Sequence, residues 1–186
     1  MNIMKIIAVT QARYGSTRLP AKVLKKVGSE TLLDIHLKRI MKSTRISDLI
    51  VATTCEPGSE EIVEIAKRNH ANYFRGSVND VLERFYFAVK DFNPDYVVRI
   101  TSDCPLIDSK IIDFVIGQCL ERNCDYASNT LKPTYPDGLD TEVFKFSALE
   151  KAYREATLKS DREHVTPYIK RNSSFNDGIL FSSYNV

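Results

Sequence analysis

Three cations and a glycine follow directly on an uncharged stretch near the start of the chain. Arg13, Arg18 and Lys22 surround Gly15 and come just after residues 6–10, which are all β-branched or small. Glycine lets a backbone come close to a phosphate, and arginine and lysine neutralise phosphate charge. This spacing predicts a loop that binds a nucleotide triphosphate. On composition alone, a solvated basic loop is an equal alternative.

An aspartate follows a second apolar stretch in the same way. Residues 6–10 and 96–101 have the composition of strands buried on both faces, which occur in parallel sheets. Ligands of such sheets bind at the carboxyl ends of the strands, so we expect Asp103 at the same edge as the basic loop. A carboxylate near a triphosphate needs a cation between them, usually Mg²⁺. Asp103 is therefore a candidate metal ligand, although an aspartate before Cys-Pro is otherwise more often a turn former.

The elements that must position these groups alternate along the chain. Strands are predicted at 6–10, 48–54, 72–75 and 96–101, and helices at 31–42, from 59, at 79–92 and at 109–123. Thr31 with Asp34 resembles a capping box, and Ser59 is predicted to cap the helix that begins there. Such alternation with short links indicates βαβ units, and hence an α/β, Rossmann-like, mainly parallel sheet flanked by helices. After residue 123 we expect strands at 126–128 and 141–146, helices at 147–156 and from 161, and an extended stretch at 179–184. The strand at 141–146 is predicted to be an antiparallel addition.

Length and composition indicate one globular domain. The 186 residues are 43% hydrophobic and 27% charged, with a net charge of +2, which is too small to indicate nucleic acid as a partner. No apolar run approaches the roughly 20 residues that span a bilayer. The beginning of the chain does not have the pattern of a signal peptide, so a cytoplasmic location is expected. The four cysteines form no C-x-x-C pair and are predicted to be reduced, mostly buried thiols.

The basic loop carries a resemblance to a known family. The pattern Q-A-R-x-G-S-T-R-L-P-x-K-x-L at 11–24 resembles the opening signature of the cytidylyltransferases that activate acidic sugars, in particular the spore-coat polysaccharide biosynthesis protein F-like branch. CMP-Kdo and CMP-sialic acid synthetases are related. The resemblance implies a fold of the nucleotide-diphospho-sugar transferase type, CTP as the donor and Mg²⁺ as the cofactor. It also implies nucleotide contacts from Gln11, Ala12, Arg13, Gly15, Ser16, Arg18 and Lys22.

Two further segments resemble motifs of this family. R-I-T-S-D-C-P-L-I-D at 99–108 is similar to the motif whose aspartate binds Mg²⁺, which implies this role for Asp103. R-G-S-V-N-D-V-L-E-R-F at 75–85 is similar to a segment beside the nucleoside, which implies base or ribose contacts for Gly76, Ser77 and Arg84. Asn79 and Asp80 could equally just begin a helix, and Asp108 is predicted to cap the next one.

The segments 135–144 and 161–169 resemble those around the acceptor sugar. The resemblance implies substrate contacts from Asp137, Asp140, Glu142, Arg162, Glu163 and His164. Carboxylates suit sugar hydroxyls, but they fit a carboxylated sugar less well because like charges repel. His164 is the one histidine with a candidate function, although a lone histidine on a helix is more often structural. His36 is predicted to be a partly exposed helical side chain.

The expected activity is transfer of CMP from CTP to a sugar hydroxyl with release of pyrophosphate, for surface polysaccharide or glycoconjugate synthesis. Arg13, Lys22 and Asp103 are the predicted catalytic residues. Family members continue with a V-D-x-x-x-D motif that this chain lacks, so we expect a single nucleotidyltransferase-like domain over 1–186 without that segment, and turnover is left open. The alternatives are a nucleotide-sugar-dependent glycosyltransferase and a nucleotide-binding module without turnover. Related synthetases often pair, so a homodimer is possible.

Overall fold

A seven-stranded mixed sheet forms the centre of the molecule. The computed structural model describes residues 4–15 and 19–186. Across the sheet the strands are β5 (Asn72–Gly76), β4 (Asp48–Thr54), β1 (Ile6–Gln11), β6 (Tyr96–Thr101), β8 (Glu142–Lys145), β7 (Tyr126–Ser128) and β9 (Ser183–Asn185). The first four strands are parallel, β8 is antiparallel to both β6 and β7, and β9 is parallel to β7. This confirms the mainly parallel sheet with an antiparallel addition.

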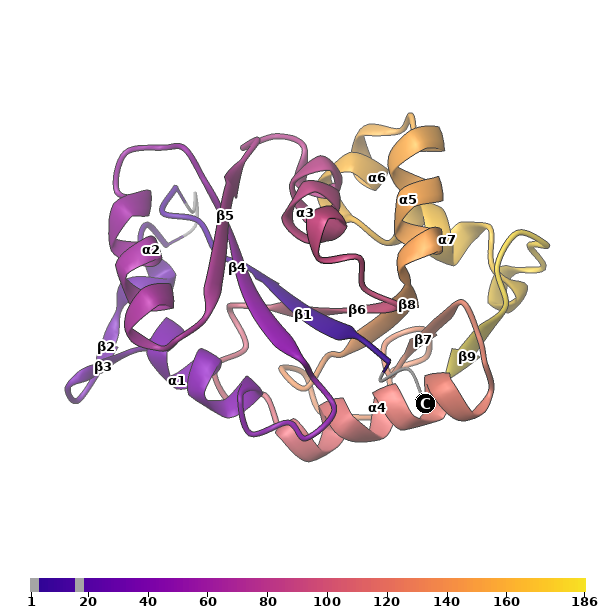
Figure 1. The fold of residues 1–186 in the computed structure, drawn as a ribbon, viewed down its shortest axis with the longest axis horizontal. Coiled ribbons are helices and arrows are strands. Elements are labelled where there is room, and N and C mark those ends of the chain that lie inside the picture. The colour runs from indigo at the N-terminus through magenta and orange to yellow at the C-terminus, as the bar shows by residue number, and fades with distance from the viewer. Residues whose placement is uncertain (1–3, 16–18) are drawn as a thin grey trace.

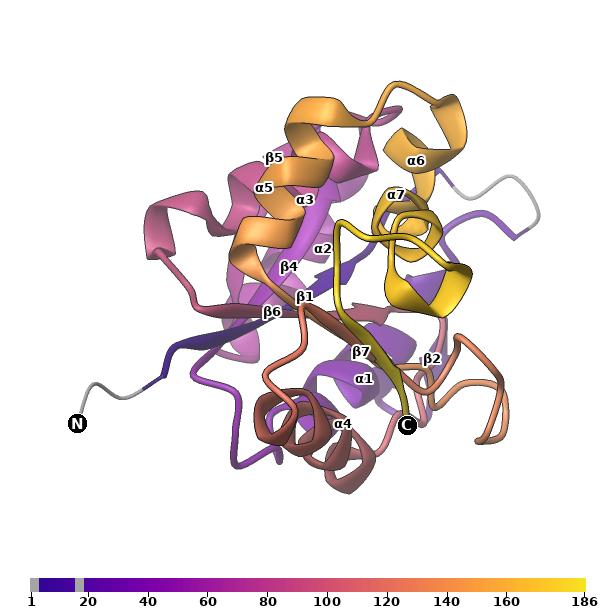
Figure 2. The same ribbon diagram turned by 90° about the vertical axis from the view of Figure 1, so that its right-hand side faces the viewer.

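Helices cover both faces of the sheet (Figures 1 and 2). One face packs against α1 (Leu32–Ile40), α2 (Ser59–Arg68) and α4 (Ser109–Glu121), and the other against α3 (Val81–Val89), α5 (Phe146–Glu155), α6 (Lys159–His164) and α7 (Pro167–Arg171). Alternate residues of β1 enter the two cores, Ile6 and Ala8 on one side and Ile7 and Val9 on the other. Burial on both faces explains why this strand carries no charge.

The remaining elements are short. They are the 3₁₀ turns η1 (Lys22–Leu24), η2 (Lys90–Phe92) and η3 (Ser174–Asn176), and a small hairpin of β2 (Lys26–Val27) and β3 (Glu30–Thr31). None of the helices in the described part of the chain is both long and apolar enough to cross a membrane.

Two of three predicted helix caps are present in the structure. Thr31 and Asp34 form the predicted capping box of α1, and the Asp108 carboxylate accepts from the Lys110 N–H at 2.8 Å, as predicted for α4. The prediction that Ser59 caps α2 is wrong. Gly58 occupies the cap position, and the buried Ser59 hydroxyl is hydrogen-bonded to that of Thr54 instead.

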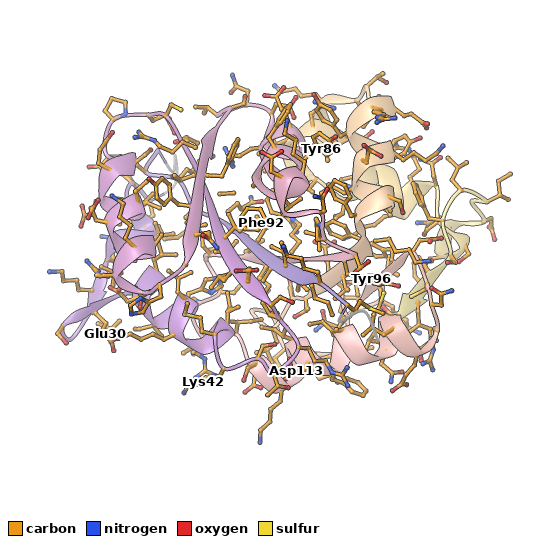
Figure 3. All side chains as sticks on the ribbon, viewed as in Figure 1. Glu30, Lys42, Tyr86, Phe92, Tyr96 and Asp113 are labelled. Carbon is orange, nitrogen blue, oxygen red and sulfur yellow. The ribbon has the colours of Figure 1, made fainter. Side chains whose placement is uncertain are left out.

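Asp113 on α4 is hydrogen-bonded to a neighbouring turn, and His36 on α1 is buried. Asp113 lies on α4 (Figure 3). Its carboxylate accepts hydrogen bonds from the backbone N–H and the hydroxyl of Thr44, at 2.9 and 2.8 Å, and so holds the turn before β4. His36 of α1 is fully buried, which corrects the prediction of a partly exposed side chain. Its burial lowers its pKa to about 4, so the imidazole is neutral at pH 7.

Candidate functional site

The strand order places the candidate site between β1 and β6. From β1 the chain adds β4 and then β5 on one side, and β6 on the other, with Gln11 directly opposite Thr101. This reversal of strand order is the point at which open α/β sheets bind ligands, beyond the carboxyl ends of the strands. Arg13 and Asp103 come directly after these two strand ends. The expectation that they leave the sheet at one edge is confirmed.

An ion pair joins the basic loop to the loop after β6. Lys22 Nζ lies 2.9 Å from Asp103 Oδ2, and the two side chains are 31% and 47% exposed. Burial favours the neutral form of Asp103, but the Lys22 ammonium outweighs it and holds the pKa of Asp103 below its ordinary value. The Ser102 hydroxyl donates to the Gln11 carbonyl at 2.5 Å, which ties the ends of the two strands together. A cation and an anion thus face solvent at the switch point.

The base of the basic loop is held on two sides. The Ala21 N–H donates to the Tyr14 carbonyl at 3.0 Å and closes the loop, while the Tyr14 ring covers Gly58. A Cβ on Gly58 would lie 2.6 Å from that ring, and its φ of +89° also favours glycine. Arg13 and Gly15 are exposed on this base, and Ala12 is buried beneath it. Ser16 and Arg18 lie outside the described residues.

Replacing Gly58 by alanine should therefore disturb the loop. Alanine at positive φ costs about 1–2 kcal/mol, and its Cβ must also displace the Tyr14 ring. We expect a lower melting temperature and roughly tenfold weaker CTP binding by calorimetry, a loss of about 1.4 kcal/mol. Gly28→Ala is the matched control, because Gly28 has φ +64° with nothing within 4 Å of its Cβ position. Equal CTP affinities for the two variants would contradict this account of the loop.

Arg84 packs against Gly76 and Ser77, in the segment that is predicted to lie beside the nucleoside. Arg84 is only 2% exposed, and its Nη1 donates to the Ser77 carbonyl at 2.5 Å. A Cβ on Gly76 would lie 2.8 Å from the Phe74 ring and 3.1 Å from Arg84 Cγ, so the close packing requires glycine. Burial and then the charge of Arg13 lower the pKa of Arg84 to about 10. Arg84 supports Ser77, and direct contact of these residues with a nucleoside stays a prediction.

Asp80 has the structural role that was the alternative for this segment. Its carboxylate caps α3 by accepting from the Glu83 N–H at 2.8 Å, and it also pairs with Arg162. Arg162 donates in addition to the Tyr153 carbonyl at 2.7 Å. Its neighbours Glu163 and His164 are exposed on α6.

A pocket of about 540 Å³ opens beside Asp103. Its lining residues are Thr101, Asp103, Cys104, Pro105, Leu106, Asp137, Gly138, Leu139 and Asp140. The structure thus brings two predicted acceptor residues, Asp137 and Asp140, together with the predicted metal ligand. Burial, followed by the charges of Asp137 and Glu142, raises the pKa of Asp140. Arg162, Glu163 and His164 are not among the lining residues.

Glu142, which is predicted to contact the sugar, has internal partners in the structure, so that contact stays a prediction. Its side chain is 4% exposed, and Arg99 and Lys170 both form ion pairs with it. The hydroxyls of Tyr126 and Thr166 also donate to its Oε1, at 2.6 and 2.8 Å. Although burial favours protonation, the two cations lower the pKa of Glu142 to about 2. The carboxylate is thus committed to internal partners because it lies on β8, in the interior of the sheet.

The sequence reasoning missed the apolar wall of the pocket. Leu106 is 69% exposed and lines the pocket with Pro105 and Leu139. Leu106 lies inside the 99–108 motif, so the signal was present, because a large apolar side chain followed the candidate metal ligand directly. No comparable feature of the sequence indicated that His36 is buried.

Comparisons with known proteins agree with this geometry. The cytidylyltransferase family profile matches residues 7–182. An uncharacterized protein of Methanocaldococcus jannaschii is 48% identical over 91% of this chain and 68% of its own length. Spore coat polysaccharide biosynthesis protein SpsF of Bacillus subtilis is 34% identical over 90% of this chain and 70% of its own length. The structure of a cytidylyltransferase from Leptospira borgpetersenii superposes with a TM-score of 0.90 at 38% identity, over 98% of this chain and 76% of that one. The chain belongs to the cytidylyltransferases, a family of nucleotidyltransferases.

Proposed function

We propose that this chain transfers CMP from CTP to a sugar hydroxyl and releases pyrophosphate, with Mg²⁺ as the cofactor. The observation that carries the proposal is the Lys22–Asp103 pair at the switch point, which opens onto the pocket that contains Asp137 and Asp140. The relative named for spore coat polysaccharide biosynthesis supports a role in surface polysaccharide or glycoconjugate synthesis. A cytoplasmic location and a homodimer stay predictions.

The cations of the basic loop, Arg13 and Lys22, would neutralise phosphate charge. Transfer of a phosphoryl-type group needs little covalent chemistry from the protein and depends on positioning and neutralisation of charge. Arg13 is exposed, and Lys22 is partly exposed and pairs with Asp103, so both side chains can turn toward the phosphates of CTP. They would stabilise the charge that develops on the leaving pyrophosphate.

Asp103 fits a magnesium ion that would be bound by this carboxylate together with the phosphate oxygens of a nucleotide. Among residues 4–15 and 19–186, no group of three or more His, Cys, Asp or Glu side chains is arranged to hold a metal ion by itself. Mg²⁺ is usually bound through one or two carboxylates plus phosphate oxygens, so the partly exposed, anionic Asp103 meets the requirement. A bound Mg²⁺ would neutralise phosphate charge and orient the triphosphate. Lys22 pairs with Oδ2 of this carboxylate and would turn toward the phosphates when Mg²⁺ and CTP bind.

The pocket beside Asp103 would receive the acceptor. A hydroxyl oxygen of the sugar would form a bond to the α-phosphorus as the bond from that phosphorus to the bridging oxygen of pyrophosphate breaks, and the hydroxyl proton would pass to a carboxylate of the pocket. Asp140 is the better proton acceptor of two pocket carboxylates, because its pKa is raised while that of Asp103 is lowered. Asp137 can accept hydrogen bonds from other hydroxyls, and Leu106 gives the pocket an apolar wall.

Product analysis tests the proposal against its alternatives. The purified chain would be supplied with CTP, Mg²⁺ and a panel of neutral and carboxylated sugars, and pyrophosphate and CMP-sugar would be quantified. Equal amounts of the two products are expected. Release of a free nucleoside mono- or diphosphate from a nucleotide sugar would favour a glycosyltransferase. CTP binding without pyrophosphate release for any acceptor would favour a binding module and would contradict the proposal.

A further inference from the structure

We infer that His36 is a positioning residue, which holds the Asp103 turn in the geometry that Mg²⁺ and CTP require. The inference deepens the proposed function and rests on it, because that function gives Asp103 its role at the metal. His36 lies on α1, 67 positions before Asp103 in the chain. Its side chain is fully buried between β1 and the loop after β6.

The two hydrogen bonds of His36 join the strands on either side of the switch point. Nδ1 lies 2.9 Å from the Cys104 carbonyl oxygen, and Nε2 lies 2.9 Å from Thr10 Oγ1. A carbonyl can only accept, so Nδ1 carries the proton, and in the neutral ring Nε2 then accepts from the Thr10 hydroxyl. The imidazole therefore bridges β1, which leads to Arg13, and the residue directly after Asp103.

The same helix holds the other end of this loop. Arg39, one turn further along α1, donates from Nε to the Ile107 carbonyl at 2.7 Å. The Cys104 carbonyl also accepts from the Ile107 N–H at 3.2 Å, which closes the turn on itself. The turn is thus short, internally bonded and attached to α1 at both ends. Loss of the His36 contact would free the end that carries Asp103.

Mutation of a residue that does not touch the metal but orients one of its ligands typically lowers metal affinity or activity by about 10- to 100-fold. His36→Leu removes the N–H that holds the Cys104 carbonyl. His36→Asn restores an N–H donor at the same number of bonds from the backbone as Nδ1. Thr10→Val is the matched control, because it removes the other hydrogen bond of the same imidazole and leaves the bond to Cys104.

The experiment is calorimetric titration of each variant with CTP, with and without Mg²⁺, together with thermal unfolding. The measured quantity is the factor by which Mg²⁺ strengthens CTP binding. We expect His36→Leu to lose about tenfold or more of that factor with little change in metal-free affinity, and His36→Asn to recover most of it. Thr10→Val should lower the melting temperature and keep the factor. If His36→Leu does not fold, the comparison of His36→Asn with His36→Gln, whose amide lies one bond further out, replaces it.

The outcomes separate this inference from the proposed function. If the wild-type chain shows the Mg²⁺ effect and the variants follow the expected order, the inference holds even if no sugar yields pyrophosphate. If His36→Leu and Thr10→Val change the Mg²⁺ factor equally, or if the wild-type chain has no such factor, the inference is overturned. Nitrogen NMR of the ring gives an independent check, since protonation at Nε2 in place of Nδ1 would exclude the assigned hydrogen bonds.

Discussion

Asp103→Asn is expected to lower kcat for pyrophosphate release by about 10²- to 10³-fold, the usual cost of removing one group that stabilises transferring charge. The asparagine keeps the size of the side chain but loses the charge that pairs with Lys22 and would hold Mg²⁺. Lys22→Ala should lower kcat to a similar extent, because it removes a cation that would neutralise the phosphates. Steady-state kinetics with saturating CTP measures both effects.

Neither change should unfold the protein. The Lys22–Asp103 pair is about a third to a half exposed, and such pairs contribute below about 1 kcal/mol. Asp108→Asn is the matched control, since it makes the same substitution in the same loop and asparagine caps a helix as well as aspartate does. A folded Asp103→Asn variant with the wild-type rate would remove Asp103 from the mechanism.

Glu142→Gln is expected to be the most destabilising of the proposed substitutions. It leaves Arg99 and Lys170 close together without their shared counter-charge, and breaking a buried pair in this way costs about 3–5 kcal/mol. For a chain of this size the melting temperature should fall by about 10 °C. Glu155→Gln is the control, because Glu155 also has a lysine and a tyrosine as partners but is exposed. Indistinguishable melting temperatures for the two variants would show that the buried network does not hold β8 to β6.

The same carboxylate predicts a dependence of stability on pH. The folded pKa of Glu142 is about 2 against an ordinary 4.5, so in this range the unfolded chain binds protons more readily than the folded chain. The stabilisation is therefore complete above about pH 4.5 and is lost as the pH falls toward 2. The difference in unfolding free energy between wild type and Glu142→Gln should shrink across this window in denaturant titrations.

The sheet and its flanking helices could be predicted because their signals are local. Uncharged β-branched runs and helical spacing are present in the sequence itself, and the position of Asp103 beside the basic loop follows from the parallel order of β1 and β6. Local pattern and the rules for parallel sheets were sufficient for this part of the site. The motif 99–108 also contained Leu106, but its place in the apolar wall of the pocket was not predicted.

The roles of Glu142 and His36 depend on contacts between distant parts of the chain. Glu142 lies at the start of the predicted strand 141–146, directly after a polar loop, and pairing of β8 with β6 places it against Arg99, 43 positions earlier. His36 finds its partner 68 positions later, in Cys104. Neither partner is indicated by spacing, because tertiary packing decides which polar side chains are buried and satisfied.

Calorimetric titration of the purified chain with CTP, ATP, GTP and UTP, each with and without Mg²⁺, tests the central claim most directly, since it needs no knowledge of the acceptor sugar. The account predicts selective binding of CTP that Mg²⁺ strengthens, and loss of the Mg²⁺ effect in Asp103→Asn. Failure to bind any triphosphate, or equal binding of all four, would contradict the assignment of a CTP site to the loop that carries Arg13 and Lys22.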